Sequence, residues 1–217
     1  KEAFRIEYWE LEEAKLRRMP PEKELAGKVA LITGAAGGIG SATANKFLKE
    51  GCCVILTDID SKALQQTKKS FQNKFGTDVV KSIVMDVTKE NDVKKAVDES
   101  VNKFGGIDIL VANAGFASAA PFDKTSSKLW DKNMAVLSKG CFLISREVYS
   151  QMMRQNMGGS IIFISSKNSL SASKGASAYS VAKSSLLHLS RSIALEGAEH
   201  KIRSNIINPD AVIQNSR

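Results

Sequence analysis

Three side chains in the last quarter of the chain could together move a proton on and off an oxygen atom. Tyr179 and Lys183 are four residues apart, and Ser166 precedes Tyr179 by thirteen residues. A free phenol has a pKa of about 10 and is a poor base at neutral pH. Residues four apart share one helix face, so the Lys183 ammonium can favour the phenolate and lower its pKa. Ser166, from a neighbouring strand end, can hold the substrate oxygen beside the phenol, which predicts general acid–base chemistry.

A glycine-rich segment near the start of the chain could hold the phosphates of a nucleotide. The apolar run Val29–Ile32 predicts a buried strand, the letters T-G-A-A-G-G-I-G follow at 33–40, and a helix-like segment reaches Glu50. Glycines let a backbone approach a pyrophosphate, and a helix N-terminus offers unpaired N–H groups and a positive dipole end. The spacing G-x-x-x-G-x-G differs from the usual dinucleotide fingerprint G-x-G-x-x-G. An ordinary tight turn is the alternative interpretation.

A second strand places a carboxylate where a nucleotide ribose would lie. Cys53–Thr57 reads as a buried strand that ends at Asp58. A carboxylate at this point accepts hydrogen bonds from ribose hydroxyls and repels a 2′-phosphate, so Asp58 favours NAD over NADP. Neither Ala36 nor Ile59 supplies a cation that could accept such a phosphate. The alternative is that Asp58 is a solvated loop residue, but strand, turn, helix, strand and terminal Asp together favour a cofactor site.

These motifs, taken in chain order, resemble the short-chain dehydrogenase/reductase family from about Leu25 to Asp210. The matching pieces are T-G-A-A-G-G-I-G at 33–40, Asp58, Asp86-Val87, Asn113-Ala114-Gly115, Ser166, Y-S-V-A-K at 179–183 and Arg203–Pro209. The resemblance implies NAD-dependent hydride transfer between the nicotinamide and a small hydroxy or oxo compound. It implies a catalytic set of Ser166, Tyr179 and Lys183. The implied cofactor-binding residues are Gly34, Gly38, Ile39, Gly40, Asp58, Asp86, Val87, Asn113, Ala114, Gly115, Tyr179, Lys183 and Pro209.

The resemblance also gives some of these residues separate roles. It implies that Asp86 meets the adenine amine and that Asn113 fixes the central sheet beside the cofactor. It further implies that Lys183 grips the nicotinamide ribose. Two alternatives stay open from the residues alone: an NAD-binding sensor or structural domain without turnover, and a reductase that acts on a different carbonyl substrate.

The elements that must position these residues alternate between strand and helix. Further strands are expected at Val79–Met85, Ile107–Ala112, Ser160–Ser165 and Arg203–Ile207, and helices at Ser61–Phe75, Lys89–Phe104, within Leu129–Asn156, and at Ala178–His200. With 217 residues, of which 43% are hydrophobic, the chain can bury one sizeable core. The alternation predicts an α/β doubly wound (Rossmann) fold of three layers with a central parallel sheet.

Composition argues against several other classes of function. The net charge of +8 comes from lysines scattered among carboxylates, so no nucleic-acid or membrane partner is expected. Cys52, Cys53 and Cys141 cannot form a paired framework, which favours a reducing compartment. His188 and His200 lack companions at metal-ligand spacing, so no metal is expected. Without a signal-like segment or an apolar run of spanning length, we expect a cytoplasmic protein with a small-molecule substrate.

The first 27 residues do not belong to the nucleotide fold. Tyr8, Trp9, Leu11 and Leu16 could form one apolar helix face that Pro20-Pro21 ends. We therefore expect a helical arm or linker over 1–27, from a preceding domain, and a short-chain dehydrogenase domain over 28–217 whose C-terminal lid and last strand are missing.

Three runs narrow the resemblance to one subgroup: W-E-L-E-E-A-K-L-R-R-M-P from Trp9, W-D-K-N-M-A-V-L at 130–137 and S-K-N-S-L-S-A-S at 166–173. They are similar to the dehydrogenase half of the bacterial bifunctional rhamnulose-1-phosphate aldolase/short-chain dehydrogenases of rhamnose catabolism. That similarity implies an aldolase domain before Lys1 and lactaldehyde as substrate. Family members usually pair through the helices predicted within Leu129–Asn156 and at Ala178–His200, which implies a homodimer or homotetramer.

Two positions depart from the family pattern. Leu137 stands where the family usually places an Asn that holds a relay water for the catalytic Lys. Asn133, four residues earlier, could replace it or be a plain helix-surface residue, and we favour the second. Asp210 stands where the family has Gly after Pro209, which puts the backbone and the polarity beside the nicotinamide in question.

Overall fold

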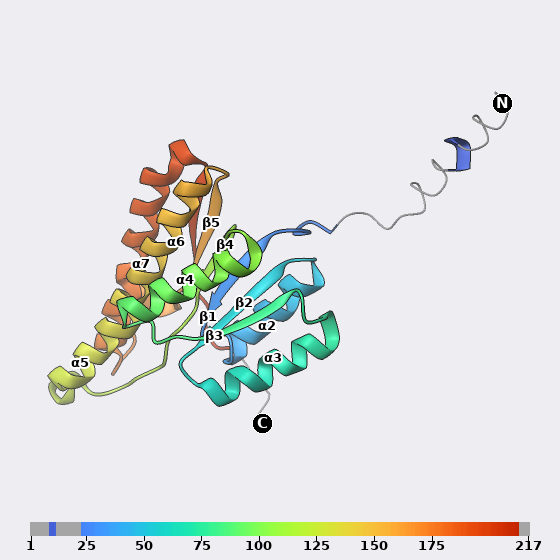
Figure 1. Ribbon diagram of the computed structural model, residues 1–217. Helices are drawn as coiled ribbons and strands as arrows, with labels where there is room; N and C mark the ends of the chain where they lie inside the picture. Colours follow the sequence, from blue (N-terminus) through green and yellow to red (C-terminus); the bar gives the residue numbers. More distant parts are fainter. Residues whose placement is uncertain (1–8, 12–22, 213–217) are drawn as a thin grey trace, which may run out of the picture.

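Six parallel strands form the centre of the molecule in a computed structural model that describes residues 9–11 and 23–212. The strand order is β3-β2-β1-β4-β5-β6 (Figure 1). The strands β2 and β3 follow on one side of β1, and β4, β5 and β6 follow on its other side. This order puts the carboxyl ends of β1 and β4 beside each other, and the crevice outside such a change of side is where open α/β sheets bind ligands. The doubly wound fold predicted from the sequence is therefore confirmed.

The strands are short and lie mostly within the core. Their bounds are β1 Val29–Thr33, β2 Cys53–Asp58, β3 Val80–Val84, β4 Ile109–Ala112, β5 Gly159–Ile164 and β6 Ile202–Ile207. Every residue of β1 and β4 is buried. Both faces of a parallel sheet are covered by crossover helices, so its strands are apolar throughout rather than alternating.

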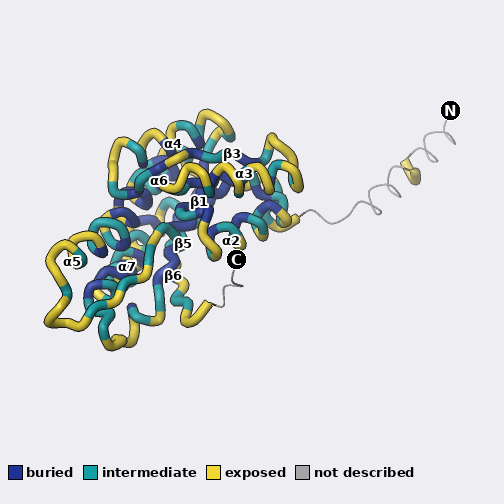
Figure 2. The backbone as a smooth tube through the Cα atoms, turned by 90° about the horizontal axis from the view of Figure 1, so that it is seen from below, coloured by how far each residue is buried: buried dark blue, intermediate teal, exposed yellow. Residues whose placement is uncertain are grey.

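Two helix layers cover the two faces of the sheet (Figure 1). The helices α2 (Gly38–Lys49) and α3 (Ser61–Phe75) pack with Ala30 and Ile32 on one face. On the other face, α4 (Glu90–Phe104), α6 (Gly140–Gln155) and α7 (Ser177–Gly197) pack with Leu31. Successive side chains of a strand point to opposite faces, so one run supplies both cores. Figure 2 shows the buried residues along the strands and the exposed ones on the outer sides of the helices.

The helix expected within Leu129–Asn156 is divided into three parts. A short helix α5 (Ser127–Asn133) leads into a π-helical turn (Met134–Lys139) and only then into α6. A π turn adds a residue to the helical repeat and rotates the side chains that follow. Short 3₁₀ turns also occur at Phe122–Lys124, Lys167–Ser169 and Ala198–His200.

Most element boundaries lie within two residues of the expected ones. The helix expected to reach His200 ends at Gly197 and continues only as a 3₁₀ turn. Among the strands, the largest difference is the start of β4, which the apolar pattern placed at Ile107. The backbone N–H and carbonyl of Ile107 are both bonded to the side chain of Gln155, at 2.9 and 3.0 Å, rather than to a neighbouring strand. In the arm, Trp9–Leu11 are helical, and the remaining residues of the expected apolar helix face, Tyr8 and Leu16, lie outside the described residues.

Candidate active site

The turn after β1 has the form of a phosphate cradle. Gly34 has a φ of +63°, and a Cβ there would lie 2.9 Å from the Cα of Ala114. A Cβ on Gly40 would overlap the carbonyl oxygen of Gly34 and lie 2.9 Å from the Cα of Ala35. Gly37, the N-cap of α2, gives no side-chain cap, so the first-turn N–H groups of Gly38, Ile39 and Gly40 are left for a ligand. A phosphate fits this end of the helix.

Asp58 holds the turn in place as well as facing the cavity in front of it. One carboxylate oxygen accepts a 3.0 Å hydrogen bond from the N–H of Ala36, and the other accepts a 3.1 Å bond from the N–H of Asp60. Each carboxylate oxygen has a second lone pair that these bonds do not use. Asp58 is thus more than a solvated loop residue, because it connects the end of β2 to the glycine-rich turn.

Asp86 lies at the end of the third strand in a network of donors. Its carboxylate accepts bonds from the N–H and the hydroxyl of Thr88, at 3.0 and 2.7 Å. Burial alone would raise the pKa of Asp86, but the two Thr88 bonds and the nearby Lys89 ammonium outweigh it and hold the pKa below its ordinary value. Asp86 is therefore ionised at neutral pH and available as an acceptor.

Asn113 joins the ends of β1 and β4. Its side-chain amide donates to the carbonyls of Thr33 and Gly34, at 2.9 and 3.1 Å. The hydroxyl of Thr33 in turn accepts from the N–H groups of Asn113 and Ala114, each at 2.9 Å. These bonds fix the cradle against the strand that carries Asn113-Ala114-Gly115.

A cavity of about 310 Å³ opens in front of these strand ends. The predicted cofactor residues that line it are Gly34, Asp58, Asp86, Val87, Ala114 and Gly115. Its wall also includes Lys132, whose ammonium lies 4.8 Å from the ring centre of Phe116. Sequence reasoning missed both residues, because the loop after β4 and helix α5 meet only in the folded chain and neither carries a motif.

Ser166, Tyr179 and Lys183 are brought together at the carboxyl end of β5. Lys183 is 5% exposed, and its ammonium donates a 2.7 Å bond to the carbonyl of Ile164, two residues before Ser166. The same ammonium lies 6.0 Å from the ring centre of Tyr179. Burial lowers the pKa of Lys183, and the nearby Cys141 thiol only partly opposes this. A lysine so placed can release a proton more readily than an exposed one.

The Ser166 hydroxyl is oriented by its own loop. Its oxygen accepts a 3.2 Å hydrogen bond from the N–H of Asn168, which leaves the O–H proton free to donate elsewhere. Pro209 reaches the same loop from β6, where its carbonyl accepts a 2.9 Å bond from the N–H of Lys167. Pro209 therefore lies beside the loop that begins at Ser166 and is not among the residues that line the 310 Å³ cavity.

Leu137 is fully buried, and both it and Lys183 lie close to Gly115. A Cβ placed on Gly115 would be 2.9 Å from a Leu137 methyl group and 3.7 Å from the Lys183 nitrogen, so the methyl and the ammonium flank the same glycine. An apolar methyl offers no hydrogen bond to a relay water. The position at which the family pattern expects the amide of an Asn is therefore occupied by the apolar side chain of Leu137.

The interpretation of Asn133 as a plain helix-surface residue is wrong. Asn133 is fully buried, its side-chain oxygen accepts a 3.0 Å bond from the Ser118 hydroxyl, and its amide donates 2.8 Å to the carbonyl of Leu129. Ser118 of the loop after β4 is bonded to this side of α5, which the sequence interpretation left exposed. The side-chain oxygen of Asn133 thus binds the loop, and its amide binds the preceding turn of its own helix.

Two further findings concern metals and membranes. Among the described residues, His, Cys, Asp and Glu side chains form no group of three that could hold a metal ion. None of the helices within those residues has both the length and the apolar character needed to cross a bilayer.

Comparisons with known proteins concern the family and the fold. The family model for short chain dehydrogenases matches residues 28–215. An uncharacterised oxidoreductase of Bacillus subtilis, YuxG, is 49% identical over 99% of this chain, which spans only 31% of that protein's length. A solved structure of NAD⁺-bound xylitol dehydrogenase has a TM-score of 0.83 at 34% identity, over 87% of this chain and 72% of its own. A solved structure of a 3-ketoacyl-(acyl-carrier-protein) reductase of Brucella melitensis, complexed with NADH, has a TM-score of 0.81 at 29% identity. The match covers 87% of this chain and 77% of the reductase chain.

Proposed function

This chain belongs to the short-chain dehydrogenase family, and we propose that it is an NAD-dependent oxidoreductase that acts on a small hydroxy or oxo compound. The observation that carries the proposal is the buried Lys183 beside Tyr179, tied to the strand that ends at Ser166. Bound NAD would accept or supply the hydride. Support for that cofactor comes from the uncapped start of α2, the glycine cradle, and the NAD⁺-bound and NADH-bound relatives.

The cofactor site is proposed to use the predicted residues in two groups. Gly34, Gly38, Ile39 and Gly40 would hold the pyrophosphate through backbone N–H groups. The residues proposed to hold the adenosine half and the central region are Asp58, Asp86, Val87, Asn113, Ala114 and Gly115, and those proposed to hold the nicotinamide half are Tyr179, Lys183 and Pro209. The Asp58 carboxylate favours NAD, since its charge would repel a 2′-phosphate.

The three catalytic residues would divide the proton transfer between them. The Ser166 O–H donates to the substrate oxygen, because the Ser166 oxygen is already engaged by the Asn168 N–H. Tyr179 accepts the hydroxyl proton during oxidation and returns it during reduction. The Lys183 ammonium stabilises the phenolate that forms, at a distance set by its bond to Ile164. The same residues serve both directions of the reaction.

The finer proposal is that the substrate is lactaldehyde and that an aldolase domain precedes the arm. It rests on the three runs that resemble the bifunctional rhamnulose-1-phosphate aldolase/short-chain dehydrogenases. The Bacillus subtilis relative, which shares nearly all of this chain, extends well beyond the shared stretch and is compatible with a further domain. None of the relatives named above has an aldolase in its name. The proposed division is an arm over 1–27 and a dehydrogenase domain over 28–217.

Oxidation of an aldehyde at this site is proposed to use the hydrated form. A gem-diol would give up a hydride to NAD⁺ and a single proton to Tyr179, which would leave the carboxylic acid and NADH. A thiohemiacetal route needs a reactive cysteine. Burial raises the pKa of the Cys141 thiol to about 11, with only a small opposing effect of Lys183, so Cys141 does not serve as that nucleophile.

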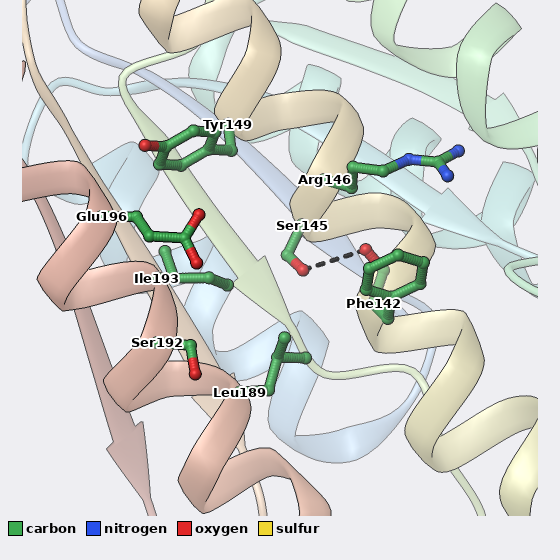
Figure 3. A pocket seen from close by; sticks show the side chains of 8 residues that line it. All are labelled: Phe142, Ser145, Arg146, Tyr149, Leu189, Ser192, Ile193 and Glu196. Carbon is green, nitrogen blue, oxygen red and sulfur yellow. Dashed lines mark hydrogen bonds between the residues drawn. The ribbon is translucent and has the colours of Figure 1, made fainter.

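A homodimer or homotetramer is proposed to form through α6 and α7. Figure 3 shows the groove between these helices, in which Phe142 and Tyr149 of α6 face Leu189 and Ile193 of α7. Phe142 is 42% exposed in the single chain. Association of a second copy would cover this apolar strip. Light scattering that gives the mass of one chain at micromolar concentration would contradict the proposal.

The substrate proposal is tested by mixing the full-length protein with NAD and L-lactaldehyde and following the absorbance of NADH. Propane-1,2-diol with NAD tests the opposite direction, in which lactaldehyde is the product of the alcohol. The proposal expects NADH from at least one of the two. NAD binding by calorimetry without NADH from either would favour the alternative of a nucleotide-binding domain, for which the apolar Leu137 beside Lys183 is the one specific observation.

A further inference from the structure

We propose that the ion pair between Lys167 and Asp210 selects an uncharged substrate that carries a hydroxyl group next to the reacting carbon. The inference rests on the proposed function and names the substrate class of the same site. Lys167 directly follows Ser166 in the sequence, and Asp210 directly follows Pro209. Neither side chain has a role in holding the cofactor or in the proton transfer described above.

Several bonds fix the Lys167 and Asp210 loops against each other. The N–H of Ser165 donates 2.8 Å to the carbonyl of Ile207, and the N–H of Lys167 donates 2.9 Å to the carbonyl of Pro209. The hydroxyl of Ser169 donates 2.9 Å to the side-chain oxygen of Asn208. The turn that carries Asp210 is therefore held along the loop that begins at Ser166. The backbone that carries Asp210 therefore lies beside the residue that follows Ser166, and the proposal places a substrate oxygen at the Ser166 hydroxyl within reach of both side chains.

The pair neutralises the charge of Lys167, the lysine that directly follows Ser166. The Lys167 ammonium and one carboxylate oxygen of Asp210 are 2.6 Å apart, and the two side chains are 53% and 66% exposed. A free lysine beside the reacting oxygen would attract a carboxylate or a phosphate ester. With Asp210 in contact, an anionic substrate gains little from Lys167 and is repelled by the carboxylate. The site accordingly disfavours hydroxy acids and sugar phosphates.

Asp210 also offers an acceptor to a neutral substrate. Its Oδ1 atom takes the contact with Lys167, and within residues 23–212 no hydrogen bond occupies its Oδ2 atom. An ionised carboxylate only accepts hydrogen bonds, so a substrate hydroxyl is a suitable donor to it. A compound with two adjacent oxygens can place one at Ser166 and the other at Asp210. Neutral 1,2-diols and 2-hydroxyaldehydes have this arrangement.

The first experiment compares kcat/KM for propane-1,2-diol and 1-propanol, which lacks the second hydroxyl. We expect Asp210→Asn to lower kcat/KM for the diol about tenfold and to leave that for 1-propanol within about twofold, since one charge-assisted hydrogen bond is lost. Glu50→Gln is the matched control, because Glu50 forms a similar 2.5 Å ion pair with Lys46 at the opposite end of α2 from the cradle. Equal losses for diol and propanol would overturn the inference.

The second experiment measures inhibition by lactate, an anion of similar size. We expect Asp210→Asn to lower the inhibition constant of lactate about tenfold, because Lys167 is then unpaired. The double variant Asp210→Asn with Lys167→Gln should lose this gain. An inhibition constant that is the same in all three proteins would contradict the selection of charge. If the wild type turns over but Asp210→Asn changes neither the ratio of kcat/KM for diol and propanol nor the inhibition constant of lactate, this inference alone is refuted. If the wild type forms no NADH with any substrate, the proposed function is refuted as well.

Discussion

The Lys183 ammonium donates a 2.7 Å hydrogen bond to the carbonyl of Ile164, so the helix that carries Tyr179 is tied to the strand that ends beside Ser166. The bond takes one of the three ammonium donors and points the group at the base of the site. Lys183 is almost without contact with solvent, and the buried Leu137 lies close to the same glycine, Gly115. This bond connects Lys183, and the helix that also carries Tyr179, to the strand that precedes Ser166.

The burial of Lys183 predicts a specific dependence of stability on pH. Its folded-state pKa lies below the ordinary 10.5, with burial as the main cause. Between these two values the unfolded chain binds more protons, so this group raises the free energy of unfolding as pH rises. Relative to Lys183→Met, the wild type should therefore gain stability as pH rises from the lowered folded-state pKa towards 10.5. Urea unfolding of both proteins across that range measures it. A constant difference between the two would contradict the lowered pKa.

Replacing Leu137 by Asn should restore a polar path to Lys183 at a cost in stability. Placing an amide where a buried methyl packs on Gly115 costs about 3 kcal/mol in the free energy of unfolding. If proton exit limits turnover, Leu137→Asn has a higher kcat and a smaller solvent isotope effect than wild type. Leu137→Ala is the control, because it loses similar packing without gaining an amide. A rise in kcat in both variants, or in neither, would argue against a missing relay.

Asp58→Ala should weaken NAD binding about tenfold and reduce the preference for NAD over NADP. The change removes the acceptor of the Ala36 N–H along with the carboxylate charge. Asp60→Ala controls for local structure, because Asp60 caps α3 through the N–H groups of Lys62 and Ala63. We expect the control to lose about 1 kcal/mol of stability with its NAD affinity unchanged. Calorimetric titration of each variant with NAD and with NADP measures both affinities. An equal loss of NAD affinity in Asp58→Ala and Asp60→Ala would contradict a direct role of Asp58 in the site.

Cys141→Ala should leave the rate of lactaldehyde oxidation within about twofold of wild type, since the gem-diol route uses no thiol. Burial keeps the Cys141 thiol protonated, with a pKa of about 11. Steady-state NADH formation and mass spectrometry for an acyl adduct provide the check. A loss of several orders of magnitude, or an adduct on the wild-type enzyme, would establish covalent chemistry instead.

Much of this molecule could be read from its sequence, because the information was local. The run Val29–Ile32 and the glycines after it give both the first strand and the cradle, and Ser61–Phe75 is a helix with the bounds that its sequence predicts. The burial of Asn133 could not be predicted, because it depends on the hydroxyl of Ser118 in another loop. The π turn between α5 and α6 carries no local signal in the residues Met134–Lys139.

The charged contacts of the site also could not be predicted from the sequence. Lys132 enters the proposed cofactor cavity only because α5 packs beside the loop that carries Phe116. The contact between Lys167 and Asp210 joins two strand ends that are adjacent only in the folded sheet. The departure at Asp210 could be noticed in the sequence, but its partner could not be identified there.

The most direct test of the account compares the wild type with Tyr179→Phe in the NAD-dependent assay. The variant keeps the ring beside Lys183 and removes only the hydroxyl that is proposed to carry the proton. We expect NADH formation to fall about a hundredfold or more, with NAD binding by calorimetry unchanged. Equal NADH formation by the two proteins would contradict Tyr179 as the proton acceptor and, with it, the proposed mechanism.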